Sequence, residues 1–448
     1  MTATDSTIDD ARRATHRAVE AVWRIESARL IARLARLVAD VGLAEELAQD
    51  ALVVALERWP QTGVPENPGP WLLATAKHRA IDRLRRQERY ARKLALLTRD
   101  IQIRQEYAEA DRDAELDDHI GDDLLRLVFT AAHPVLSGEA KVALTLRLLG
   151  GLTTPEIARA FLVSESTAAQ RIVRAKRTLA AANVRFELPT RAQLPERLAA
   201  VLEVVYLIFN EGYAATSGPD WARPELCHEA LRLGRLLAGL LPAEPEVHGL
   251  LALMELQASR LRARVDAAGQ PVPLLDQDRR SWDRLLIRRG LDGLARAEAL
   301  GIGSYTLQAA IAACHARATR AEQTDWPRIV ALYEVLAHLQ PTPVVLLNRA
   351  AAVGLAGDPR RGLSLVDELA QERALRDYPQ LPAVRGELLA RLGHAGPARD
   401  EFLRAAELTG NDGAVPAPRR RAGHLTDTRR GQRLGPPRCG LDAQVTPV

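Results

Sequence analysis

The side chains best suited to a chemical task lie between residues 166 and 180, where four basic residues occur without an acidic one. Guanidinium and ammonium groups neutralise DNA phosphates, and Arg and Gln side chains also form hydrogen bonds with base edges in the major groove. The candidates for such contacts are Ser166, Thr167, Gln170, Arg171, Arg174, Lys176 and Arg177. We therefore expect a helix that presents this segment to DNA.

The surrounding sequence predicts the two helices that would position these residues. Thr154 and Pro155 suit a helix start, with the hydroxyl as cap and the proline in the first turn. Ser164 suits the cap of a second helix. At 100° per residue, the expected buried stripe of that helix comprises Ala168, Ile172, Ala175 and Leu179. The pattern indicates a helix-turn-helix, although an amphipathic hairpin with a solvated basic face shares it.

A second basic segment follows Trp71 and ends near Lys93, with only Asp82 and Glu88 as acids between 77 and 93. Basic side chains can hold a nucleic-acid backbone while an aromatic ring stacks on a base. The candidates are Trp71, Lys77, Arg79, Arg83, Arg85 and Arg86. On these residues alone, a solvated helix face with a core tryptophan is the better interpretation.

An acidic segment precedes this basic one, across a loop rich in proline at 60–70 that we expect to end a helix. Its polar residues are spaced about one turn apart, and they are Glu45, Glu46, Gln49 and Asp50. We expect them opposite an apolar stripe of Leu43, Leu47, Ala51 and Val54. Such a face contacts a basic partner surface or water.

Catalytic and metal-binding arrangements are not evident in the sequence. Cys227, Cys314 and Cys439 lack metal or disulfide spacing. The Cys–His neighbours at 227–228 and 314–315 would point about 100° apart on a helix, which prevents a nucleophile–base pair. Asn210 and Glu211 with nearby tyrosines fit a small-molecule pocket or, as the better interpretation, a buried polar network. We expect no enzyme, no metal and no cofactor.

Composition predicts an all-α protein, because Ala, Leu and Arg favour helices and no alternating β-branched run occurs. Neither a signal peptide nor a membrane-spanning run is present, so we expect a cytoplasmic protein without a membrane contact. The predicted parts are a helical bundle at 1–93, an acidic linker at 94–123, the helix-turn-helix unit at 124–186, a helical domain at 194–411 and a disordered basic tail at 412–448.

The helical domain shows a weak internal repeat. LAGDPRRGLSLVDELA at 355–370 aligns with LGHAGPARDEFLRAAE at 392–407, which places the small residues Gly362 and Ala398 in register. The offset is close to the period of about 34 residues in tetratricopeptide repeats. After Asn411 the pattern stops, and the segment is either a genuine basic tail or, as we favour, a frame-shifted end.

The order of these segments resembles the extracytoplasmic-function group of RNA polymerase sigma factors. Region 2 of that group has an acidic Ala-Glu-Asp-like segment and then a Trp-Leu segment ending in Asp-x-x-Arg-Arg. Here these read AEELAQDAL at 44–52 and WLLATAKHRAIDRLRR at 71–86. Region 4 ends in a helix-turn-helix like EIARAFLVSESTAAQRIVRAKRTL at 156–179. The resemblance implies an alternative sigma factor, with core RNA polymerase and promoter DNA as partners.

The same resemblance implies a role for each set of residues. The acidic set at 45–50 would face the clamp of the polymerase β′ subunit, and the β flap would receive region 4. The basic set at 71–86 would act at the −10 promoter element, and the set at 166–177 would read the −35 element. The acidic linker would pass through the RNA exit channel. His78 stands where many relatives have Asn, so the resemblance does not imply a contact at this position.

The C-terminal part resembles the tetratricopeptide-like extension of one sigma-factor subgroup. The resemblance rests on VVYLIFNEGYAATSG at 204–218, LLDQDRRSWD at 274–283 and YTLQAAIAACHA at 305–316. It implies a domain that regulates the factor, with an unidentified small-molecule or protein ligand. The alternative is a helix-turn-helix regulator fused to a ligand-sensing helical repeat, which explains 124–408 equally well but leaves 20–93 unexplained.

Overall fold

A computed structural model describes residues 3–97, 120–161, 163–214, 222–267, 271–409 and 422. Within these ranges helices follow one another without a β-strand, and an isolated antiparallel bridge joins Val265 to Pro271. The expected all-α fold is confirmed. The predicted linker and tail lie largely outside the described residues.

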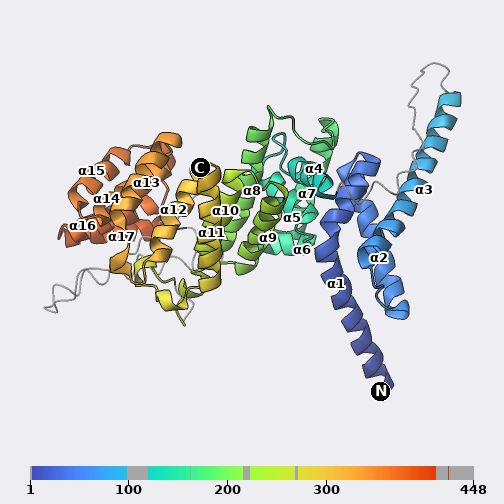
Figure 1. Ribbon diagram of the computed structural model, residues 1–448, viewed down its shortest axis with the longest axis horizontal. Helices are drawn as coiled ribbons and strands as arrows, with labels where there is room; N and C mark the ends of the chain where they lie inside the picture. Colours follow the sequence, from blue (N-terminus) through green and yellow to red (C-terminus); the bar gives the residue numbers. More distant parts are fainter. Residues whose placement is uncertain are drawn as a thin grey trace. The chain divides into compact units, whose positions relative to one another are not determined.

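The chain divides into two compact units, Met1–Val204 and Val205–Val448 (Figure 1). The helices of the first unit are α1 (Ala3–Val38), α2 (Val41–Thr62), α3 (Pro68–Leu97), α4 (Ile120–Ala131), α5 (Gly138–Leu148), α6 (Thr154–Ala160) and α7 (Glu165–Ala181). Helix α8 (Leu194–Tyr213) contains the division between the units.

Helix α1 organises the first unit, because it packs against α2, α3, α4 and α5. Its Ile31 and Leu34 are almost completely buried, as are Trp59 of α2 and Leu72 of α3. The predicted bundle at 1–93 and the predicted unit at 124–186 therefore share contacts and form one compact unit, although a linker separates them in the sequence.

Two helix ends in this unit differ from the expectation. Helix α2 starts where Asp40 accepts a hydrogen bond from the Leu43 N–H, and it continues through Pro60 to Thr62. The expected break at 60 was wrong, because a proline close to the last turn removes only one backbone hydrogen bond. The loop is correspondingly short, and α3 begins at Pro68, three residues before Trp71.

The second unit is a succession of helices that pack mainly against their neighbours in sequence. They are α9 (Pro224–Leu240), α10 (Pro245–Ala258), α11 (Arg284–Leu300), α12 (Ser304–Arg317), α13 (Trp326–Leu339), α14 (Pro343–Leu355), α15 (Pro359–Leu369), α16 (Gln380–Arg391) and α17 (Ala395–Leu408). The short 3₁₀ turns are η1 (Leu261–Ala263), η2 (Leu274–Asp276), η3 (Arg279–Ser281), η4 (Ala321–Gln323) and η5 (Arg373–Leu375).

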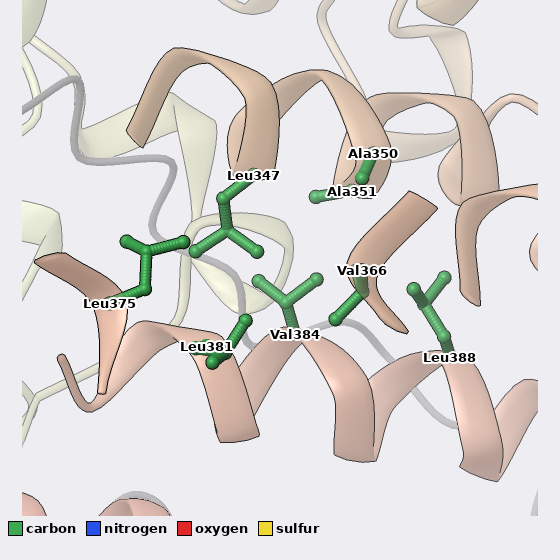
Figure 2. Packing of buried hydrophobic residues seen from close by; sticks show 8 residues of the cluster. All are labelled: Leu347, Ala350, Ala351, Val366, Leu375, Leu381, Val384 and Leu388. Carbon is green, nitrogen blue, oxygen red and sulfur yellow. The ribbon is translucent and has the colours of Figure 1, made fainter. Parts of the chain in front are cut away.

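Figure 2 shows how α14, α15 and α16 enclose one of the apolar cores of this unit. Leu347, Val366 and Leu388 are fully buried and come from three successive helices. Small residues permit the close crossings, since a Cβ atom on Gly362 would lie 2.9 Å from the Ala350 carbonyl oxygen. Each helix pair thus buries its apolar face against the next pair.

The residues aligned by the internal repeat occupy similar places. Gly362 lies at the crossing of α15 with α14, and Ala398 lies where α17 crosses α16 at Gly386. Ala422, a described residue of the predicted tail, is buried in a cluster with Ala398 and Phe402. At this residue the expectation of a loosely packed tail is wrong, because Ala422 covers part of the last helix pair.

Candidate nucleic-acid interface

Helices α6 and α7 form the predicted helix-turn-helix from capped starts. Thr153, rather than the expected Thr154, caps α6, because Glu156 completes a capping box with the Thr153 backbone and hydroxyl. Burial alone would raise the pKa of Glu156, but the Thr153 hydrogen bonds and the Arg24 charge lower it below its usual value. Ser164 caps α7 as predicted, by accepting a hydrogen bond from the Thr167 N–H.

The buried and exposed faces of α7 are those expected. Ala168, Ile172, Ala175 and Leu179 are buried. On the opposite face Ser166, Gln170, Arg174 and Arg177 are exposed, and Thr167 is half-buried. This face presents two guanidinium groups and an amide without an acid, which suits phosphates and base edges.

Two basic side chains of α7 lie outside this open face. Arg171 forms an ion pair with Glu139 of α5, with 3.0 Å between nitrogen and oxygen. Lys176 forms an ion pair with Glu45 of α2, and only 21% of its side chain is exposed. The seven residues predicted to read DNA therefore divide into an exposed group and two that are engaged within the protein.

The acidic and basic sets on α2 and α3 contact each other. Arg79 lies 3.2 Å from Asp50, and Arg83 lies 3.5 Å from Glu46, with all four side chains about half exposed. Ion pairs in such surroundings contribute only about 0–1 kcal/mol, so a partner can replace them at little cost. Arg85 and Arg86 are exposed on the same helix, and Lys77 is half-buried.

Trp71 lies at the start of α3, where it packs edge-to-face against the buried Trp59, with 5.3 Å between ring centroids. Trp71 itself is half-buried, so one part of its ring contributes to the core and another part reaches the surface. The arrangement fixes an aromatic ring beside the basic side chains of α3.

Glu45 is not on the exposed face of α2, so its expected position was wrong. Its side chain is 2% exposed and accepts a hydrogen bond of 2.6 Å from Nε of Arg147, on α5. Lys176 and Gln49 also contact its carboxylate. Arg147 was not among the residues predicted for this site, although it is the lone charged residue in the apolar segment ALTLRLL.

Three motifs of the C-terminal part converge on a buried polar network. The hydroxyl of Tyr206 forms hydrogen bonds with Asn210 and Gln257, and burial raises its pKa. The Arg264 guanidinium lies over the Tyr213 ring at 3.4 Å, and Arg279 donates to the His315 and Ala318 carbonyl oxygens. The polar-network interpretation agrees with these contacts.

The two cysteines that the structure describes in this unit do not form a nucleophilic site. Cys227 and Cys314 are buried, and burial raises the pKa of Cys227 to about 12. Among the described residues, no group of His, Cys, Asp and Glu side chains could hold a metal ion. Likewise, none of the described helices has the length and apolarity required to cross a membrane.

Comparison with known proteins matches both halves of the first unit. A model of sigma-70 region 2 matches residues 25–90, and a model of sigma-70 region 4 matches residues 126–179. The chain therefore contains sigma-70 regions 2 and 4. The two regions support a sigma-factor role in promoter recognition, and sigma factors are non-enzymatic DNA-binding proteins of transcription initiation.

Two further matches carry no stated function, and one of them extends over most of the chain. A family of unknown function (DUF6596) matches residues 197–298. An uncharacterized protein of Rhizobium meliloti (strain 1021) is 46% identical over 398 residues, which are 88% of this chain and 92% of that protein. The region 2 match also accounts for the residues that the alternative of a helix-turn-helix regulator leaves unexplained.

Proposed function

We propose that this protein is an alternative sigma factor of the extracytoplasmic-function type, which binds core RNA polymerase and directs it to particular promoters. The exposed basic face of α7, in a region 4 that follows a region 2, is the observation that carries the proposal. Arg174, Arg177 and Gln170 contact the −35 element, and Arg171 and Lys176 join them once their ion pairs are released.

Region 2 provides the other contacts. Arg79, Arg83, Arg85 and Arg86 act at the −10 element with Trp71 and Lys77. Glu46 and Asp50 bind the β′ clamp. On binding, their surface ion pairs with Arg83 and Arg79 are replaced by contacts with polymerase side chains. Gln49 and Glu45 lie beside this surface, and region 4 contacts the β flap.

The C-terminal unit regulates the factor. Its helix pairs stack like those of tetratricopeptide repeats, and the close crossings at Gly362 and Gly386 support this likeness. A ligand of this unit, either a small molecule or a protein, would provide the signal.

Charge reversal on α2 tests polymerase binding. We expect the full chain with Glu46→Lys and Asp50→Lys to lose co-elution with core polymerase and to keep its helical content, because both side chains are half exposed. Glu57→Lys, at an exposed position of the same helix, is the matched control and should co-elute normally. Unchanged co-elution of the double variant would refute the assignment of this surface.

A further inference from the structure

Three arginine side chains lie close to two aromatic rings in the interior of the second unit. The guanidinium carbon of Arg260 lies 5.7 Å from the ring centroid of Tyr213 and 5.8 Å from that of Trp282. Arg264 lies 3.4 Å from the Tyr213 centroid, and Arg279 lies 5.0 Å from the Trp282 centroid. All five residues are buried, and we call them the arginine cluster.

Backbone hydrogen bonds bring the segments of this cluster together. Arg260 and Arg264 flank η1, which directly follows α10, and Trp282 directly follows η3. The Asp283 N–H donates to the Ser259 carbonyl oxygen at 2.8 Å, which joins the end of η3 to the end of α10. The backbone therefore holds like-charged side chains near one another, although their charges repel.

The positive charge of the cluster is not balanced by its own surroundings. Within the part of the chain that the structure describes, no carboxylate forms an ion pair with Arg260 or Arg279. Arg279 donates instead to neutral acceptors, which are two backbone carbonyl oxygens and the Thr324 hydroxyl. A buried guanidinium keeps its proton and is costly without a counter-charge. The two cations therefore favour an anion beside them.

The pKa values of two groups reflect the same excess of positive charge. Burial, followed by the charge of Arg260, lowers the pKa of Arg279 from 12.5 to about 10, and the charge of Glu322 opposes this only as the smallest cause. Burial, followed by the charges of Arg260 and Arg279, lowers the pKa of His315. An anion in the cluster would oppose both effects of charge.

The cluster also contains hydrogen-bond donors that lack an acceptor. Among the described residues, the Tyr213 hydroxyl, Nε1 of Trp282 and Nε of Arg279 are buried without a hydrogen-bond partner. Indole and guanidinium N–H groups only donate, and a tyrosine hydroxyl can donate. Buried polar groups in proteins are normally paired, so these donors require an explanation. A matching ligand supplies acceptor oxygens together with negative charge.

We propose that the arginine cluster is a binding site for a small oxyanion, either a carboxylate or a phosphate. Planar guanidinium groups bind both kinds of group through paired N–H donors. The site is not sealed, because Arg260 remains 7% exposed. Binding depends on the second unit alone, and only the identification of this anion with the regulatory ligand rests on the proposed function.

Binding of inorganic phosphate and of acetate to the full chain tests the site. Both anions are small members of their classes, so size does not exclude them. We expect saturable binding of at least one of them in equilibrium dialysis at constant ionic strength. Arg260→Met should weaken this binding by about tenfold, since a charge-assisted hydrogen bond is lost. Arg288→Met, at an exposed position of α11, is the matched control and should bind like the wild type.

Thermal unfolding separates a binding role of Arg260 from a structural one. In a buffer without phosphate or carboxylate, Arg260→Met should melt at the wild-type temperature or above it, because methionine removes an uncompensated buried charge. The added anion should raise the melting temperature of the wild type but not that of the variant. A lower melting temperature of the variant in both buffers, together with unchanged anion binding, would assign Arg260 a structural role and overturn the site.

Trp282→Phe serves if Arg260→Met does not fold, because it keeps an aromatic ring and removes the indole N–H. It should weaken anion binding severalfold. Absence of saturable binding of either anion to the wild type, or equal affinities of the wild type and the folded variants, overturns the site. These measurements contain no polymerase, so their failure is distinct from a failure of the proposed function, which co-elution with core polymerase tests.

Discussion

The basic side chains of α7 differ in their surroundings, and this difference predicts different contributions to DNA binding. Arg174 and Arg177 are exposed, whereas Arg171 and Lys176 are held by Glu139 and Glu45. An exposed guanidinium can bind DNA without losing a protein partner. A paired side chain must first exchange one ion pair for another, which reduces its net contribution.

Replacement of Arg174 tests this difference. We expect Arg174→Ala to weaken binding to −35 DNA by about 1–3 kcal/mol if the guanidinium contacts a base. Fluorescence anisotropy at fixed salt concentration measures the change, and Arg288→Ala, at an exposed position of the second unit, is the matched control. Equal affinities of the two variants for −35 DNA would remove Arg174 from the reading face.

A buried histidine predicts a pH dependence of stability. Burial, followed by the charges of Arg260 and Arg279, lowers the pKa of His315 from 6.5 to about 3. The folded state disfavours the protonated ring. The contribution of neutral His315 to the free energy of unfolding is therefore complete above pH 6.5 and decreases as the pH falls towards 3. Denaturant unfolding at pH 7 and pH 5 should show that the wild type loses about 2 kcal/mol more than His315→Gln, whose side chain does not titrate. Equal losses of unfolding free energy in the wild type and in His315→Gln would contradict the lowered pKa of His315.

The position of Glu45 could be predicted only in part from the sequence. At 100° per residue Glu45 lies about 140° from Asp50 but only 40° from Gln49, so the acidic set does not form one face. That division could have been predicted. The burial of Glu45 could not, because its partner Arg147 is 102 residues away in the sequence, and local spacing carries no information about this contact.

Among the elements, helices with a strong period were predictable, and their ends were less so. The buried stripe of α7 followed from its 3.6-residue period. The cap of α6 was misplaced by one residue, although the capping-box spacing between Thr153 and Glu156 identifies it. Pro60 does not end α2, because a proline near the end of a helix destabilises it little.

The crossings between helices predict which glycines the second unit requires. We expect Gly362→Ala to destabilise this unit by about 1–3 kcal/mol, because the added methyl group would meet the Ala350 carbonyl oxygen at 2.9 Å. Gly396→Ala, on α17 with no atom within 4 Å of the new methyl group, should be neutral or stabilising by up to about 1 kcal/mol. Thermal unfolding of both variants measures the difference, and similar melting temperatures would contradict it.

For the whole molecule, composition and periodicity were sufficient to predict the all-α fold. The order of the motifs was sufficient to predict regions 2 and 4. The sequence did not predict that these regions pack into one unit. That packing depends on contacts between segments about a hundred residues apart, such as Arg24 with Glu156 and Glu45 with Arg147. Nor did it predict that Ala422 would cover Phe402, because the segment around it lacks a helical period.

The division between the units lies within α8, and this predicts how the chain can be truncated. Arg197 of α8 donates a hydrogen bond of 2.6 Å to the Phe129 carbonyl oxygen of α4, so the start of α8 packs on region 4. We expect a fragment of residues 1–190 to bind core polymerase, because the proposed contacts lie on α2, α3 and α7. It should unfold at a lower temperature than a fragment of residues 1–213, which keeps α8.

Pull-down with core polymerase and thermal unfolding of both fragments measure the two expectations separately. A folded 1–190 fragment that does not bind core, beside a 1–213 fragment that does, would show that α8 contributes to the polymerase-binding surface. Equal melting temperatures would instead show that the Arg197 contact adds nothing to region 4, and that α8 belongs to the second unit alone.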